Sequence, residues 1–512
     1  MSSLIDDLLK PGAYPHPVAE LRLVETHISW VILTGEVAYK IKKPVDFGFL
    51  DFSSIDKRKA CCDAELVLNR RFGSDIYLDV VPIAHGDGGA RIGGPGAAID
   101  WAVKMRQFPD DAQMDVRLRA GRVDANDLAR FAEDLAALHG RLPRAPADSE
   151  FGSRALVWAP VGENFEQIDG TPFAARRRAD LHEIREWSRA LHAALTSHFE
   201  ARRTAGFIRE CHGDLHLSNL VWLAGRAVAF DCIEFNARLR WIDVVSDAAF
   251  LAMDLDTRGR TDLAYVFLDR YLERSGDYEG ARALGFYLSY RTMVRAKVAA
   301  LGARDAVAPP SADVARFDLH VDYALARARK QRPLLLLMCG VSGSGKSWLA
   351  ERLVPRLPAV RVRSDVERKR MHGLAPTARA SAAPQQGLYA DAATDATYAR
   401  LEACTAALIA GGVDAIVDAT FLSASRRARF RALAERLGAR DRVLVCTAPE
   451  AVLLERVRAR NLAARDPSDA DETILRAQLD AGLELDQNER ALTADTSKPI
   501  DWSRLLASIN AD

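Results

Sequence analysis

Several runs of apolar, β-forming residues between positions 19 and 108 have the pattern that is typical of β-strands. Between residues 19 and 44, β-rich runs are broken at 26–29 and at 34–36, and this spacing predicts a three-stranded antiparallel meander. Further strand-like runs cover residues 76–83, 90–92 and 101–108, with glycine-rich turns between them. We expect these runs to form a five-stranded N-terminal lobe.

Other stretches of the chain have apolar positions at helical spacing. Residues 54–72 have apolar positions at helical intervals, with Glu65 near the middle. Residues 124–140 and 174–203 have the same periodicity, and a proline-bearing stretch lies between them. The pattern therefore predicts that the lobe following the first sheet is helical.

A continuous apolar run at residues 334–339 opens into a glycine-rich turn and then into a helix. The turn reads GVSGSGKS and matches GxxxxGK[ST] without a mismatch. Its glycines let the backbone N–H groups point at phosphate oxygens, and the following helix adds its positive N-terminus. We expect Lys346 to reach the β- and γ-phosphates of ATP and Ser347 to ligate Mg²⁺. The predicted nucleotide-binding residues of the turn are Gly340, Gly343, Ser344, Gly345, Lys346 and Ser347.

Two later apolar runs end in an acidic residue. Residues 359–363 are followed by Ser364 and Asp365, and residues 413–418 end at Asp418. Ligands bind at the carboxyl ends of strands in open α/β sheets, so Asp365 is placed to meet a phosphate acceptor. Asp418 is in the Walker B arrangement, which holds Mg²⁺ through water.

Lys40 and Glu65 form a second candidate phosphate grip. Lys40 lies two residues after Ala38 on the third predicted strand, the arrangement by which kinases hold the α- and β-phosphates, and Lys42 lies on the same face. Glu65 could pair with Lys40. A solvated basic edge strand and a solvated mid-helix glutamate are the alternatives that this pattern leaves open.

Residues 211–220 read CHGDLHLSNL, and a short apolar run after them ends at Asp231. This HGDxxxxN pattern resembles the catalytic loop of aminoglycoside phosphotransferases and choline kinases. The resemblance implies that Asp214 accepts or orients the proton of an acceptor hydroxyl and that Asn219 and Asp231 bind Mg²⁺. It also implies that Asp247 braces the loop.

One feature departs from the kinase pattern. The turn at residues 26–29 reads THIS in place of the glycine loop of protein kinases. Phosphate contacts there would come from Ser29 or from backbone amides, or be absent, so specificity for aminoglycosides is not implied.

The helix expected at residues 449–460 sets Arg456 and Arg460 on one face. With Arg465, these residues resemble the mobile arginine lid of gluconate kinase, polynucleotide kinase and zeta-toxin-type P-loop kinases. The resemblance covers about residues 334–478 and implies a catalytic role for Arg460 and a nucleotide contact for Arg456. A solvated arginine pair is the alternative.

Composition narrows the class of protein. The 512 residues contain 70 Lys and Arg and 70 Asp and Glu, so no global field favours nucleic acid or an anionic membrane. The first residues lack a signal-peptide pattern, and no apolar run is long enough to span a membrane, so we expect a cytoplasmic protein. The seven cysteines include no CxxC pair and indicate neither a zinc site nor a disulfide framework.

Together these features predict two fused kinase domains, as in bacterial predicted kinases that join such halves. Residues 1–330 are expected to have the bilobal, protein-kinase-like phosphotransferase fold, and residues 331–512 a P-loop fold with a parallel sheet flanked by helices. The predicted activity is ATP- and Mg²⁺-dependent phosphorylation of small-molecule hydroxyls by both domains, because both sets of motifs are intact. Two alternatives are a nucleotide-sensing regulatory protein, in which one domain gates the other, and a polynucleotide 5′-hydroxyl kinase in the C-terminal domain.

Overall fold

The computed structural model describes residues 3–511 except 49, 74, 87, 95, 303–309, 330–331, 377, 379–390, 464–467, 469 and 487–488. By its internal contacts the chain divides into two compact units. The first unit contains Met1–Asp127, Leu142–Val157 and Phe199–Leu251, and the second contains Leu128–Arg141, Trp158–His198 and Ala252–Asp512. The domain boundary predicted at residues 330–331 lies outside the described residues and stays a prediction.

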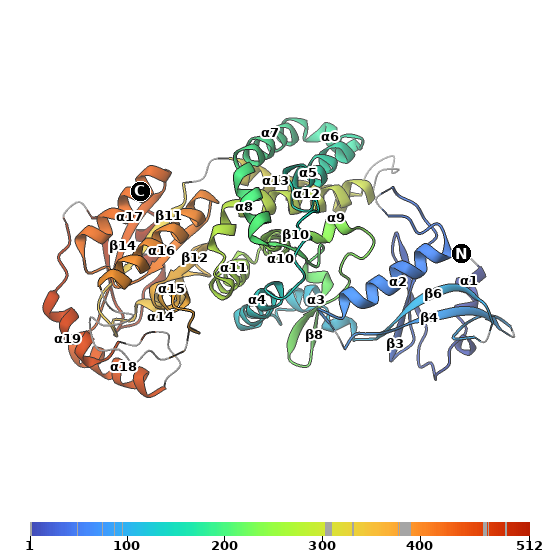
Figure 1. Ribbon diagram of the computed structural model, residues 1–512, viewed down its shortest axis with the longest axis horizontal. Helices are drawn as coiled ribbons and strands as arrows, with labels where there is room; N and C mark the ends of the chain where they lie inside the picture. The colour runs from blue at the N-terminus through green and yellow to red at the C-terminus, as the bar shows by residue number, and fades with distance from the viewer. Residues whose placement is uncertain are drawn as a thin grey trace. The chain divides into compact units, whose positions relative to one another are not determined.

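The first unit is built on an antiparallel sheet with the strand order β1-β2-β3-β6-β4-β5 (Figure 1). Its strands are β1 (Arg22–Glu25), β2 (Ser29–Leu33), β3 (Val37–Lys42), β4 (Tyr77–Gly86), β5 (Gly89–Ile92) and β6 (Ala98–Arg106). The predicted meander is confirmed by β1, β2 and β3. The expected count of five strands is one too few, because all six predicted runs join the sheet: the run at residues 90–92 forms β5, a hairpin partner of β4 that pairs Ile92 with Ile83 at the edge.

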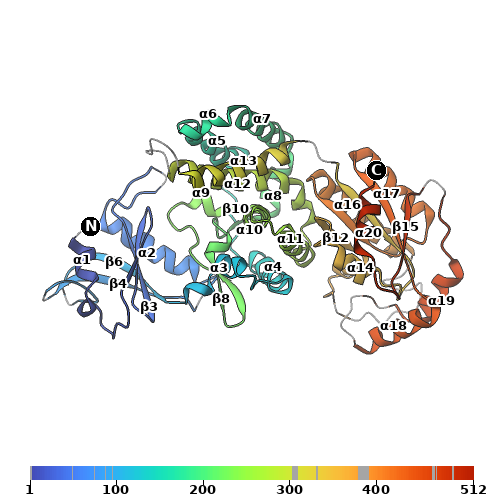
Figure 2. The same cartoon turned by 180° about the vertical axis from the view of Figure 1, so that it is seen from behind.

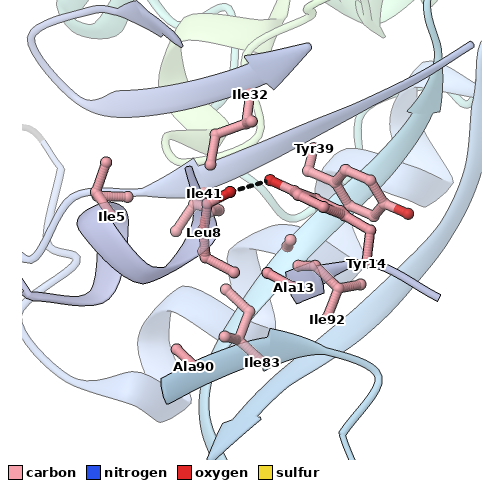
Figure 3. Close-up of a cluster of buried hydrophobic side chains, with 11 residues drawn as sticks. Ile5, Leu8, Ala13, Tyr14, Ile32, Tyr39, Ile41, Ile83, Ala90 and Ile92 are labelled. Atoms are coloured by element: carbon pink, nitrogen blue, oxygen red, sulfur yellow. Dashed lines mark hydrogen bonds between the residues drawn. The ribbon is translucent and has the colours of Figure 1, made fainter. Parts of the chain in front are cut away.

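The alternation along β3 decides which face of the sheet carries charge. Tyr39 and Ile41 are fully buried in an apolar cluster with residues of α1 (Ser3–Leu8) and the short helix η1 (Pro11–Ala13). Figure 3 shows this cluster, in which the Tyr14 hydroxyl donates to the Leu8 carbonyl over 2.6 Å. Since successive strand residues point to opposite faces, Lys40 and Lys42 lie on the other face.

Helix α2 (Ile55–Asn69) covers that other face, packing against β6 and β4 (Figure 1). The helix begins after Ser54, whose side chain accepts a hydrogen bond from the Lys57 N–H and so satisfies one of the free amides of the first turn. Glu65 is thereby carried to the face of the sheet that holds the two lysines.

Two short antiparallel strand pairs complete the first unit. The strand β7 (Ile208–Glu210) pairs with β10 (Trp241–Asp243), and β8 (Leu220–Leu223) pairs with β9 (Arg226–Ala229), both antiparallel. The 211–220 segment connects β7 to η3 (Leu217–Asn219) and β8, so it is anchored at both ends by strands. The remaining helices of this unit are η2 (Asp110–Ala112), α3 (Met114–Arg119) and α9 (Ala237–Arg240).

Apart from these short strands, the described chain from residue 110 to residue 329 is largely helical, as predicted. Four helices are divided between the two units: α4 (Ala125–His139), α5 (Arg154–Asp169), α8 (Thr196–Ala205) and α10 (Val244–Thr257). The second unit also contains α6 (Pro172–Arg176), α7 (Arg178–Ala194), α11 (Thr261–Ser275), η4 (Tyr278–Ala283), α12 (Leu284–Gly302) and α13 (Ser311–Ala328).

A parallel sheet with the order β12-β13-β11-β14-β15 follows in the second unit. Its strands are β11 (Leu334–Cys339), β12 (Ala359–Arg363), β13 (Asp414–Asp418), β14 (Arg440–Thr447) and β15 (Ala491–Asp495). The strands β11, β12 and β13 correspond to the runs predicted at residues 334–339, 359–363 and 413–418, whereas β15 was not predicted because its sequence, ALTAD, is short and only weakly apolar.

Helices flank this sheet, which confirms the predicted fold class. Figure 1 shows α16 (Asp391–Ala410) and α17 (Ala424–Leu437) in front of the strands, and Figure 2 shows α20 (Trp502–Asn510) on the side seen from behind. The others are α14 (Lys346–Leu353), α15 (Ser364–Met371), α18 (Glu450–Ala463) and α19 (Glu472–Ala481). None of the helices in the described part of the chain combines the length and the apolar character that a membrane span requires.

Candidate active sites

Five charged groups form a chain of ion pairs on the α2 side of the first sheet. The Lys40 Nζ lies 2.9 Å from Glu65 Oε1 and also donates to Asp231 Oδ1. The Lys42 Nζ lies 2.7 Å from Glu65 Oε2 and also donates to Glu234 Oε1. The predicted pairing of Lys40 with Glu65 is confirmed, and both lysines share this one carboxylate.

Burial makes these pairs strong determinants of local geometry. Lys42 and Glu65 are fully buried. Burial alone would lower the pKa of Lys40, but the carboxylates of Asp231 and Glu65 raise it well above its ordinary value. Burial would raise the pKa of Glu65, and the two lysines hold it below its ordinary value instead. Lys40 and Glu65 therefore both carry their charges at neutral pH, and the solvated alternatives for these two residues do not apply.

Asp247 braces the 211–220 segment, as expected. Its carboxylate accepts from the N–H groups of His212 and Gly213 at 3.0 and 2.8 Å. Gly213 has φ 85°, and a Cβ there would lie 2.7 Å from the Leu239 carbonyl oxygen, so no larger residue fits. His212 is buried, and burial lowers its pKa, so it is neutral. Its Nε2 donates to the Phe230 carbonyl at 2.9 Å, which ties this segment to the residue preceding Asp231.

Asp214 and Asn219 are joined within this segment. The Asn219 side-chain N–H₂ donates to the backbone oxygen of Asp214 at 2.9 Å and to its Oδ2 at 3.0 Å. His216 Nε2 lies 3.3 Å from the same carboxylate. The Asp214 side chain is 37% exposed, so it is held in place while remaining open to an incoming molecule.

Asp231 adopts a strained backbone conformation. Its φ of 62° is in the left-handed region, which residues with a Cβ seldom occupy. The Asp231 N–H donates to the Tyr77 hydroxyl at 2.9 Å, and this contact fixes the turn. The Asp231 side chain is 41% exposed. The predicted metal-binding pair of Asn219 and Asp231 thus consists of an amide and a carboxylate, the oxygen donors that suit Mg²⁺.

The turn at residues 26–29 is closed by its own side chains. The Thr26 Oγ1 accepts from the Ser29 N–H at 2.9 Å. The Ser29 Oγ is buried and has no hydrogen-bond partner among the described residues. Ser29 pairs with Lys42 across β2 and β3, so it lies on the charged face of the sheet. An orphaned hydroxyl at this place leaves Ser29 as one candidate phosphate contact of the turn, beside the backbone amides and the alternative that the turn makes no such contact.

The glycine-rich turn of the second unit has the backbone that its sequence predicts. Gly340, Gly343 and Gly345 have φ values of 139°, 79° and 81°. A Cβ on Gly340 would lie 2.5 Å from the Cys446 carbonyl oxygen, and one on Gly345 would lie 2.7 Å from Thr496 Oγ1. The turn therefore packs directly on β14 and on the residue after β15, and only glycine leaves room for it.

Several polar groups at this turn are suited to an anion. Burial lowers the pKa of Lys346, and the carboxylate of Asp418 counteracts this only in part. The Lys346 Nζ donates to the Val341 carbonyl at 2.8 Å within the turn. The Ser344 Oγ is buried without a hydrogen-bond partner among the described residues. The residues present thus fit a bound phosphate.

A pocket of about 340 Å³ lies next to the turn. The predicted site residues that line it are Gly343, Gly345, Lys346, Ser347, Asp365, Asp418, Arg456 and Arg460. Gly340 and Ser344 belong to the turn but are not among the residues that line the pocket. Ser347 and Asp418 offer a hydroxyl and a carboxylate, which are suitable Mg²⁺ ligands.

Asp365 and Asp418 reach this pocket from neighbouring strands. Asp365 lies in the first turn of α15, directly after β12, and accepts from Arg368 Nη1 at 3.0 Å. Asp418 ends β13 and is 5% exposed. The Arg363 Nε lies 3.7 Å from Asp418 Oδ2. The parallel pairing of β12 with β13 is what brings these acids to one edge of the sheet.

Arg456 and Arg460, the two arginines expected to belong to a lid, differ in their surroundings. Arg456 donates to the Gly343 carbonyl at 3.2 Å and to Oγ1 and O of Thr496, both at 2.8 Å, so its guanidinium also supports the turn. Arg460 donates to the Ala470 carbonyl at 2.7 Å, while its Nε is buried without a partner among the described residues. Arg465 lies outside the described residues.

Sequence reasoning missed four residues of these sites. Glu234 pairs with Lys42, and its place three residues after Asp231 was the available signal. Gln478 accepts from the Ser342 N–H at 2.7 Å, and Thr496 donates to the Ser344 carbonyl at 2.8 Å. Arg363 was read only as the end of a strand. No local pattern marks Gln478 or Thr496, because their roles depend on where α19 and β15 pack.

Comparison with known proteins agrees with this geometry. Residues 108–284 match the model of the phosphotransferase enzyme family, and residues 335–483 match an AAA domain. The uncharacterized proteins Rv2004c of Mycobacterium tuberculosis and Mb2027c of Mycobacterium bovis are each 30% identical to this chain over 486 residues, which is 94% of the chain and 94% of each relative. The chain belongs to their family.

Solved structures resemble parts of the chain. A choline/ethanolamine kinase family protein from Mesorhizobium loti covers 61% of this chain and 92% of its own, with 14% identity and a TM-score of 0.37. The match to a gluconokinase from Sinorhizobium meliloti 1021 covers 35% of this chain and 91% of the gluconokinase chain, with 20% identity and a TM-score of 0.25. By the family models, this chain carries a phosphotransferase-family domain followed by a P-loop AAA domain.

Proposed function

We propose that this chain is a bifunctional phosphotransferase that uses ATP and Mg²⁺ to phosphorylate hydroxyl groups of small molecules. The observation that carries the proposal is that each unit holds its own complete set of groups. The first unit has a buried lysine and glutamate pair beside Asp231 and an exposed Asp214. The second has the glycine-rich turn with Lys346 beside Asp365 and Asp418.

In the first unit, Asp214 would orient the acceptor hydroxyl and receive its proton. Its carboxylate is held by Asn219, and its segment is held by Asp247, so little reorganisation is needed. Lys40 would exchange its contact with Asp231 for the nucleotide phosphates. Lys42 would keep Glu65 in place during this exchange, because it binds the other oxygen of the same carboxylate.

In the second unit, Asp365 would orient the acceptor, while Lys346 and Arg460 would stabilise charge on the transferring phosphoryl group. Asn219 and Asp231 in the first unit, and Ser347 and Asp418 in the second, would hold Mg²⁺, which neutralises the β- and γ-phosphates when bound. The remaining groups act by position. Arg456 supports the turn, and Gln478 holds the Ser342 amide.

The test compares the full-length protein with two variants that each remove one acceptor acid. Wild type is incubated with γ-labelled ATP, Mg²⁺ and a fractionated pool of small hydroxyl compounds, and the labelled products are separated. We expect Asp214→Asn and Asp365→Asn to abolish different products, each by a factor on the order of 10²–10⁴. Asp262→Asn, which removes a carboxylate paired with Arg260 on α11, is the control and should change neither.

Two outcomes contradict the proposal. If either substitution removes every labelled product, the two sites do not act separately. If wild type labels nothing while binding ATP, the nucleotide-sensing alternative replaces phosphoryl transfer.

A further inference from the structure

The outer edge of the P-loop sheet is closed by helices that precede it in the chain. β12 is one of the two edge strands of this sheet. The backbone N–H and carbonyl of Arg361 on β12 point away from β13. The Arg361 N–H donates to Asp269 Oδ1 at 2.7 Å, and the Tyr278 hydroxyl donates to the Arg361 carbonyl at 3.1 Å. Asp269 lies on α11 and Tyr278 on η4. These two helices thus satisfy an edge that would otherwise be open to pairing.

A buried ion pair fixes the same edge. The Arg361 Nη2 lies 2.8 Å from Asp269 Oδ2, and both side chains are almost completely buried. Glu367 on α15 is fully buried and pairs with Arg400, whose Nη2 donates to the Gly276 carbonyl at 2.9 Å. A charge-assisted network of this kind has one favourable geometry, so the position of β12 depends on residues 269–278.

The contact extends to the pocket through Arg363, the last residue of β12. Its guanidinium lies between two carboxylates, with Nη1 3.6 Å from Glu273 Oε1 and Nε 3.7 Å from Asp418 Oδ2. Arg363 lines the pocket together with Ser364 and Asp365. Glu273 lies on α11, outside the P-loop segment. Its Oε2 is buried and accepts no hydrogen bond from the described residues.

The balance at Arg363 has a chemical consequence. Glu273 Oε1 and Asp418 Oδ2 lie at nearly equal distances from the same guanidinium, and Glu273 Oε1 also lies 3.3 Å from Arg270 Nη1 on its own helix. If the charge of Glu273 were removed, Arg363 would be drawn toward Asp418 and would compete with a cation for that carboxylate. The guanidinium would also move away from the acceptor side of the pocket.

We propose that Glu273 is a positioning residue of the P-loop site, which holds Arg363 away from Asp418 and makes α11 a functional part of that site. The inference rests on the proposed phosphotransferase activity of the second unit. The working P-loop kinase therefore includes the segment that begins with α11, and a change in that segment is transmitted to the metal-binding acid at the end of β13.

The experiment uses the full-length chain carrying Asp231→Ala to weaken nucleotide binding in the first unit. Mg²⁺ is titrated at fixed ATP, binding is followed by calorimetry, and slow hydrolysis of ATP is recorded in the same samples. In Glu273→Gln we expect the half-saturating Mg²⁺ concentration to rise and hydrolysis to fall, each on the order of 10-fold, as for other partners that orient metal ligands. Glu273→Asp should recover part of both losses, which a merely structural role would not predict.

Glu351→Gln is the matched control. Glu351 pairs with Arg270 of the same α11, and Arg270 also lies 3.3 Å from Glu273 Oε1, so this control changes the shared ion-pair network while leaving the Glu273 carboxylate in place. Glu351 does not line the pocket. If Glu273→Gln and Glu351→Gln give the same Mg²⁺ titration and the same hydrolysis, the positioning role of Glu273 is overturned. If Lys346→Ala leaves binding and hydrolysis in this background unchanged, the proposed function of the P-loop site fails instead, and the two failures are distinguishable.

Discussion

At the scale of single residues, the acids of the first unit differ in what holds them. Asp214 is bound by the amide of Asn219 and faces solvent, whereas Asp231 is held in a strained turn and pairs with Lys40. The first is suited to act on an acceptor, and the second to act on a cation and the phosphates it bridges. Mutation should therefore separate a loss in the transition state from a loss in the ground state.

We expect Asp214→Asn to leave the affinity for Mg²⁺-ATP within a few-fold while transfer falls by a factor on the order of 10²–10⁴. Asp231→Ala should weaken Mg²⁺-ATP binding and remove the advantage of ATP with metal over ATP without it. ATP affinity of the full chain carrying Lys346→Ala, measured with and without Mg²⁺, tests both statements. If both variants match the protein with an intact first-unit site in ATP affinity and in transfer rate, a regulatory role for this unit is favoured.

At the scale of elements, the packing of α11 on β12 is the most consequential contact of the second unit. Asp269 supplies an acceptor to the Arg361 backbone and to its guanidinium, and no water-exposed group can replace it because both residues are buried. Removal of one partner from a buried pair leaves an uncompensated charge, which costs more than the pair itself contributes.

We therefore expect Asp269→Asn to lower the free energy of unfolding of the second unit by roughly 3 kcal/mol. Urea denaturation followed by circular dichroism measures the change. The control is Asp262→Asn on the same helix, where the ion pair with Arg260 is partly exposed and should contribute less than about 1 kcal/mol. A shift no larger than that of the control would show that α11 does not stabilise the sheet edge.

At the scale of the whole molecule, each unit has its own candidate phosphate-binding residues. The lysine of the first site belongs to β3, and that of the second to the start of α14. The two sites share no residue. Their nucleotide occupancies should therefore be counted separately.

The expected stoichiometry is two ATP molecules per chain in wild type and one in Lys346→Ala, because the substitution removes the buried ammonium of the glycine-rich turn. Titration calorimetry in the presence of Mg²⁺ reports this number directly. Lys498→Ala, which changes an exposed lysine of the second unit, should still bind two. A single binding event in wild type contradicts the two-site description.

The sequence by itself determined the parts that depend on local pattern. Alternation along residues 37–42 placed Lys40 and Lys42 on the same face of one strand, and the glycines of the turn predicted a backbone that only glycine can adopt. The spacing from Asp214 to Asn219 was enough to join them in one loop. These relations hold over a few residues, so neighbouring residues specify them.

Only the tertiary structure decided the relations between distant segments. That Glu65 binds both lysines, and that Glu234 completes the chain of charges, depends on how α2 packs against the sheet. The position of the 90–92 run at the sheet edge depends on the pairing of β5 with β4, and the site of Thr496 depends on the pairing of β15 with β14. The place of Glu273 beside Arg363 depends on the packing of α11 against β12. Each of these contacts joins residues far apart in the chain, and their energies come from burial and complementary charge, which a local pattern does not encode.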